Sequence, residues 1–177
     1  MINLSITLSE RDRANLNQLG RQFPREMMQA NGRAASVVKR RVRYAMSNGG
    51  GYAGVPTFAA LQPLTVALKG RSDIGGDLAD PLKIVMYRLG VTQVVGWPNK
   101  MQGIASAFQS AEMRPTEKWE RKYIHIRAPE FGSVPTYMRP ARPVIEPLSA
   151  AVASEYPKWI MGAATKIIGK KLAKKGF

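Results

Sequence analysis

The feature that most constrains this sequence is a proline-rich connector at residues 138–147, which contains three prolines and leads into the last helical stretch. Each proline fixes its own φ and disfavours helical geometry at the residue before it. The connector is therefore expected to be stiff and largely extended, with Arg139 and Arg142 held on it. Because a stiff loop loses little entropy on docking, the connector is either a partner-binding loop or a tight turn that aims the last helix.

The length and composition favour one domain over residues 1–177. Cysteine is absent, which excludes disulfides, thiolate metal sites and a cysteine nucleophile. The first residues lack the basic flank and apolar run of a secretory signal, and no later stretch is long enough to span a bilayer. We therefore expect a soluble protein that is made in the cytoplasm and does not insert in a membrane.

Hydrophobic periodicity predicts long amphipathic helices and several short strands, two of them in a hairpin. Helical spacing of apolar residues follows Ser9, a helix-capping residue, and continues beyond Pro24. Helices are predicted at 9–23, 25–46, 63–69, 101–111 and 147–177, and Pro157 interrupts or kinks the last of them. Strands are predicted at 2–8, 83–89, 94–97 and 122–127, with a loop at 113–118. The glycine run within 47–57 predicts a flexible loop, and the lysines of 157–177 make the C-terminal helix basic.

The residues that carry most enzyme chemistry are few and scattered. His125 is the sole histidine and lies on the outward phase of a predicted strand. The twelve acidic residues form no paired carboxylates, and Asp73 and Asp77 lack the further oxygen ligands of a calcium loop. The sequence predicts no catalytic residue, no cofactor and no metal site.

The net charge of +15 points to an acidic partner, such as nucleic acid or an acidic protein surface. Basic residues cluster on the polar faces of the two long helices. Candidate contacts for DNA or an acidic partner are Lys39, Arg40, Arg43, Lys170, Lys171 and Lys174. No zinc finger, aromatic ribonucleoprotein signature or helix-turn-helix is present, and the apolar face of the C-terminal helix is too weak for a membrane-surface helix.

Three local patterns, taken in order, carry a resemblance. They are Phe58 followed by Pro63-Leu64-Thr65 and Lys69-Gly70; Gly76-Asp77-Leu78 followed by a hairpin that ends in Val95-Gly96; and Arg139-Pro140-Ala141-Arg142-Pro143 before the last helix. Together they span about 58–148. This arrangement resembles the tail completion or virion morphogenesis proteins, small neck components of tailed bacteriophages.

The resemblance implies an α+β fold in which long amphipathic helices pack on a small antiparallel sheet. It also implies a structural protein of the virion, located in the neck or upper tail, rather than an enzyme. It implies assembly with itself as a ring, a hexamer or dodecamer, between the head-tail connector and tail proteins, with DNA passing through the channel. The partner-binding candidates are Arg139, Arg142, Tyr137 and Tyr52. The alternative function is that of a basic nucleic-acid-binding protein.

Overall fold

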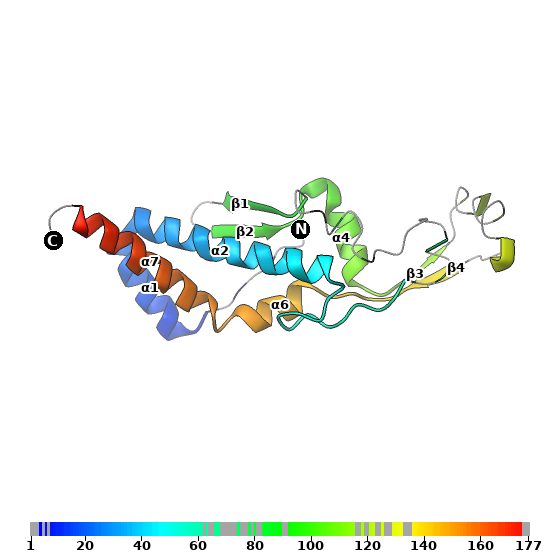
Figure 1. Cartoon of the computed structure of the whole chain (residues 1–177), viewed down its shortest axis with the longest axis horizontal. Helices are drawn as coiled ribbons and strands as arrows, with labels where there is room; N and C mark the ends of the chain where they lie inside the picture. The colour runs from blue at the N-terminus through cyan, green and yellow to red at the C-terminus, as the bar shows by residue number, and fades with distance from the viewer. Residues whose placement is uncertain are drawn as a thin grey trace.

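The fold was analysed in a computed structural model of the whole chain. The structure describes residues 4, 6, 8–61, 63, 66, 67, 74, 78, 80, 83–89, 92–115, 118, 121, 122, 125, 129–132 and 136–174. The molecule is elongated, with helices gathered at one end and a two-stranded arm at the other (Figure 1). The fold is α+β, as predicted.

Two helices begin the described part of the chain. Helix α1 (Glu10–Gln22) is capped by Ser9, whose hydroxyl accepts a hydrogen bond from the Asp12 N–H. Helix α2 (Pro24–Ser47) starts with proline at its first position, where the absent N–H costs nothing. The buried stripe of α2 consists of Glu26, Ala30, Ala34, Ala35, Val38, Val42, Ala45 and Met46. Both helices were predicted from their periodicity.

The chain ends in two more helices, α6 (Ile145–Val152) and α7 (Tyr156–Ala173). Pro157 lies in the first turn of α7, so it begins a second helix instead of kinking one. Helices α2 and α7 run antiparallel (Figure 1), with ion pairs near both ends, from Glu26 to Lys171 and from Arg41 to Glu155. Small side chains on α2, including Ala30 and Ala34, pack with Ile160 and Ala164 of α7.

A β-hairpin covers another side of α2. Strands β1 (Val85–Leu89) and β2 (Thr92–Gly96) pair antiparallel, with Leu89 opposite Thr92. This confirms the predicted hairpin. Of the predicted strand 2–8, the structure describes only Leu4, Ile6 and Leu8, and none of these three is assigned to a strand. The Leu4 N–H donates to the Val95 carbonyl at 3.4 Å, which places Leu4 beside β2. The rest of this prediction lies outside the described residues.

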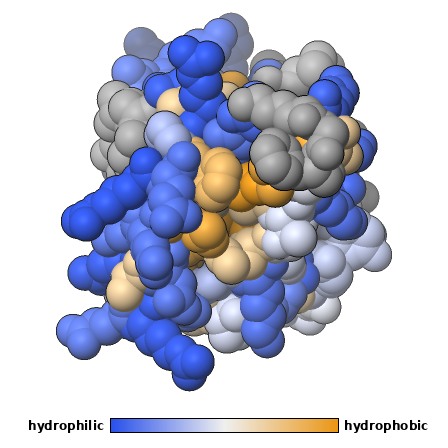
Figure 2. All heavy atoms as spheres, turned by 90° about the vertical axis from the view of Figure 1, so that its left-hand side faces the viewer, coloured by the Kyte–Doolittle hydropathy of each residue, from blue (hydrophilic) through white to orange (hydrophobic). Residues whose placement is uncertain are grey.

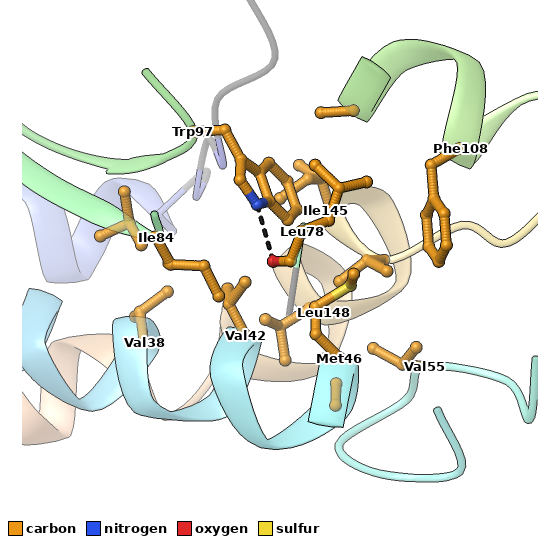
Figure 3. Close-up of a cluster of buried hydrophobic side chains, with 14 of the residues drawn as sticks. Val38, Val42, Met46, Val55, Leu78, Ile84, Trp97, Phe108, Ile145 and Leu148 are labelled. Carbon is orange, nitrogen blue, oxygen red and sulfur yellow. Dashed lines mark hydrogen bonds between the residues drawn. The ribbon is translucent and has the colours of Figure 1, made fainter. Parts of the chain in front are cut away.

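The main core lies where α2, the hairpin and α6 meet (Figure 3). Trp97 is its largest fully buried side chain, and its indole N–H donates to the Leu78 carbonyl at 3.0 Å. This bond satisfies the single polar atom of the ring and fixes Leu78 against the core. Phe108 comes from α4 (Gln102–Gln109), which follows the short helix η2 (Asn99–Met101) and confirms the predicted helix at 101–111.

The glycine-rich segment after α2 contains hydrogen-bonded turns within the loop predicted at 47–57. The Gly50 N–H donates to the Ala45 carbonyl and the Phe58 N–H donates to the Gly49 carbonyl, and Gly49 and Gly50 both have positive φ. Val55 and Phe58 are buried in the core. Glycine at these two positions permits the left-handed backbone, and the flexibility of the loop stays a prediction.

Gly54 should tolerate no side chain. Its φ is +80°, and a Cβ built there would lie 2.8 Å from the Ala151 Cβ and 3.0 Å from the Pro147 carbonyl oxygen. We expect Gly54→Ala to lower the free energy of unfolding by about 2 kcal/mol or more, as measured by urea denaturation. Gly103→Ala is the control: this glycine lies within helix α4 with open space around it. The control should gain about 0.5–1 kcal/mol, and equal effects of the two substitutions would contradict the packing described for Gly54.

The arm consists of strands β3 (Glu112–Pro115) and β4 (Thr136–Arg139), paired antiparallel from Glu112 opposite Arg139 to Pro115 opposite Thr136. The short helix η3 (Pro129–Phe131) lies beyond it. The arm extends past α4 and α6 (Figure 1). The prediction of a loop at 113–118 is wrong for residues 113–115, which belong to β3. Of the predicted strand 122–127, the structure describes only Lys122 and His125, and both are helical; the other residues of this prediction lie outside the described part of the chain.

Candidate functional site

Arg142, predicted to be presented to a partner, is instead buried within the chain. Its side chain is 4% exposed. The guanidinium donates from Nε to the Ala59 carbonyl at 2.9 Å and from Nη2 to the Ala60 carbonyl at 3.1 Å, and it lies 5.8 Å from the centroid of the Phe108 ring. Burial, followed by the charge of Arg139, lowers the pKa of this guanidinium. The rigid connector therefore fixes the segment after the glycine turn, and the prediction that it presents Arg142 is wrong.

The other three predicted partner-binding residues lie in two separate places. Arg139 is half-buried in β4, and Tyr137 lies two residues earlier in the same strand, opposite Arg114. Both belong to the arm. Tyr52 lies in the turn after α2, 38% exposed, with its ring centroid 4.5 Å from that of Tyr44.

Removal of the Arg142 side chain should weaken the contact between the connector and residues 59–60. Arg142→Ala forfeits two charge-assisted hydrogen bonds, and we expect the free energy of unfolding to fall by about 1–3 kcal/mol. Arg40→Ala is the control, because Arg40 is exposed on α2 and its loss should change stability by less than about 0.5 kcal/mol. Chemical denaturation of both variants measures the difference, and an unchanged Arg142→Ala midpoint would refute the structural role of this guanidinium.

The predicted basic contacts differ in their surroundings. Arg40, Lys170 and Lys174 are exposed, and Lys39 and Arg43 are half-buried. Lys171 forms an ion pair with Glu26, so it holds α7 against the N-terminal end of α2. This engagement makes Lys171 a structural residue in the isolated chain.

A continuous basic face on α2 was only partly recognised from the sequence. Besides Arg40, the exposed side carries Arg25, Arg33 and Tyr44. Spacings of four, seven and eight residues place these side chains on one side of a helix. The signal was present in the sequence, since the buried stripe of α2 defines the opposite side. Glu26, the sole acid of α2, is 7% exposed and paired with Lys171, so it offsets little of the charge on this face.

The ion pair of Glu26 should make the free energy of unfolding depend on pH in the acidic range. The hydrogen bond from Lys171, first among the causes, lowers the pKa of the Glu26 carboxyl. Because the pKa of Glu26 is lower in the folded than in the unfolded state, the ionised carboxylate stabilises the fold at pH values above the unfolded pKa. This contribution is lost as the pH falls through the folded pKa. Glu26→Gln should be less stable at neutral pH, and its disadvantage should shrink on acidification. Melting temperatures of both proteins at several pH values between about 3 and 7 measure this; a pH-independent difference would contradict the assignment.

A cavity of about 990 Å³ opens at the helical end of the molecule. Its lining combines Leu16 and Arg21 from α1, Met27 and Met28 from α2, and Val94 from β2, among others. An apolar area ringed by hydrophilic side chains is visible at this end (Figure 2). Tyr156 also lines the cavity and donates its hydroxyl to Asn31 Oδ1 at 2.7 Å. Burial raises the pKa of Tyr156 to about 12, which keeps the phenol neutral.

Groups typical of catalysis do not converge within the described part of the chain. No cluster of three or more histidine, cysteine or acidic side chains suited to a metal ion occurs among the described residues. His125 is exposed and helical. None of the described helices is both long and apolar enough to cross a membrane.

Comparison with known proteins found no matching family, no similar curated protein and no similar solved structure.

Proposed function

We propose that this chain is a structural subunit of a bacteriophage neck, a tail completion protein that joins or seals the head-tail junction as part of an oligomeric ring. The proposal is supported by the order of the sequence patterns described above and by the shape of the subunit. Its localisation would be the virion, and its partners would be further copies of itself and the adjoining connector and tail proteins.

The arm is the observation that carries this proposal. A two-stranded ribbon on its own is marginally stable in water, because it has no second layer on which to bury a face. Here β3 and β4 extend beyond the helical body (Figure 1), and Met113 on β3 is 59% exposed. An exposed arm with a large apolar side chain is suited to packing on a neighbouring subunit, where its strands gain the missing layer.

The junction between arm and body supports the same function. The Arg142 N–H donates to the Phe108 carbonyl at 3.1 Å, and the Ile145 N–H donates to the Gln109 side chain at 2.9 Å. Together with the Arg142 guanidinium, these bonds fix the connector to α4 and to the turn after α2. A closed ring requires a constant angle between neighbouring subunits, and an arm with a rigid base favours such an angle.

The second candidate function is that of a basic nucleic-acid-binding protein. The basic exposed face of α2 favours it, as does the net charge of +15. The two functions differ in their response to salt. Phosphate binding weakens steeply as salt rises, whereas subunit contacts with a substantial apolar part persist.

A substitution on the arm tests ring assembly. Met113→Glu places a charge in the proposed contact and should lower the oligomer's affinity by at least about tenfold, since an unpaired buried charge costs several kcal/mol. The measurement is sedimentation or native mass spectrometry of the purified protein, in which a ring has six or twelve times the 19.5 kDa subunit mass. If the ring forms only on the head-tail connector protein, binding of the variant and of the unsubstituted protein to purified head-tail connector particles is compared instead.

The matched control is Met161→Glu. Met161 is also an exposed methionine, 38% accessible, but it lies on α7 in the helical body. The control should leave assembly unchanged. Equal assembly by Met113→Glu and the unsubstituted protein would reject the arm as the contact.

A further inference from the structure

Arginine side chains form a row along the exposed side of helix α2. Arg25, Arg33 and Arg40 are exposed on the side opposite the buried stripe. Fifteen residues separate the first from the last, a span of about 22 Å along the helix. The same side carries the polar residues Gln29 and Ser47, both exposed, and the sole acid of the helix is buried.

Helix α7 extends this charge. Its residues 156–173 include Lys158, Lys166 and Lys170, all exposed, and no acid. The ion pair from Lys171 to Glu26 brings the C-terminal end of α7 to the N-terminal end of α2, which places Lys170 and Lys174 near the level of Arg25. Lys158 lies three residues after Glu155, which pairs with Arg41, so exposed cations run along the length of both helices.

The composition of this face distinguishes nucleic acid from protein as its partner. Protein interfaces have an apolar core that is depleted in charged residues, whereas protein–DNA interfaces are polar and strongly positive. The α2 row contains arginine, glutamine and serine, and its one large apolar group, Tyr44, lies toward the end and contacts Tyr52. The cations lie in a line along one helix, which matches a rigid polyanion. A flexible acidic peptide would lose conformational entropy on binding to the same line of cations.

We propose that the exposed face of α2, extended by the lysines of α7, binds the phosphate backbone of duplex DNA, with Arg25, Arg33 and Arg40 as phosphate contacts. An α-helix can lie against or within the major groove, and contacts to phosphate give affinity without sequence preference. This inference stands apart from ring assembly, because it concerns a helical face and not the arm.

The test compares two triple variants of the full chain. Arg25→Gln, Arg33→Gln and Arg40→Gln together remove the proposed contacts. Arg11→Gln, Arg13→Gln and Arg21→Gln together remove the same number of charges from exposed positions on α1. Both variants have the same net charge, so a difference between them reports the location of the contact. Melting curves establish that both remain folded, as surface substitutions are expected to.

The probe is a duplex of mixed sequence, about 30 base pairs long, which exceeds the length of α2. Its affinity is measured by fluorescence anisotropy between about 50 and 200 mM salt. The unsubstituted protein and the α1 variant should show the same steep slope of log affinity against log salt. The α2 variant should have a slope shallower by about three, roughly one for each lost phosphate contact.

Three results would overturn the inference: equal slopes for the two variants, tighter binding to a single strand of the same length, or equally tight binding to polyglutamate of matched charge. The first would remove α2 from the contact, the second would reject a duplex as the ligand, and the third would reduce the interaction to general polyanion binding. None of these results affects the assembly test on Met113, so failure of one proposal is distinct from failure of the other.

Discussion

The packing of the α2 stripe is the constraint on which the rest of the structure depends. Alanines toward its N-terminal end allow close contact with α7, whereas Val38, Val42 and Met46 toward its C-terminal end meet Trp97, Ile84 and the hairpin (Figure 3). One helix thus joins the two clusters of the core. Because this stripe is covered by other elements, Arg25, Arg33 and Arg40 of the same helix remain on the opposite side, and the basic face follows from the packing.

The attachment of the arm to the helical body is the second feature on which the structure depends. The connector carries no regular structure between β4 and α6, yet its backbone and the Arg142 side chain bond to α4 and to residues 59–60. A buried guanidinium is costly unless its donors are satisfied. Here backbone carbonyls accept from it, so one side chain ties the connector to residues 59–60. The direction of the arm therefore depends on the same residues that close the core.

The sequence predicted what depends on local pattern. The apolar period of α2, the cap at Ser9 and the hairpin from β1 to β2 are all decided by residues close together in the chain, and all were predicted. Strand β3 was missed because four residues are too few to show an apolar–polar alternation. Its partner β4 begins more than twenty residues later, so no local hairpin pattern indicates the pair. The N-terminal alternation predicted a strand at 2–8. The structure describes only Leu4, Ile6 and Leu8 of it, none of them in a strand, and the other residues lie outside the described part of the chain.

The candidate site was less predictable, since burial depends on contacts distant in sequence. Arg142 reads as a presented charge, and only the approach of residues 59–60, more than eighty positions earlier, buries it. A run of glycines has the same composition whether it serves mobility or positive φ, so the sequence does not predict the turn that Gly49 and Gly50 form. Arg25 and Arg33 lie outside the dense basic cluster around Arg40, although the helical period alone places them on the same face.

Electron microscopy of purified virus particles from the source of this chain, combined with mass spectrometry of separated heads and tails, tests the central claim most directly. The account predicts a ring of copies at the head-tail junction, with each arm packed on its neighbour. Absence of the chain from particles, with recovery of the protein on DNA at low salt, would contradict a structural role in the neck.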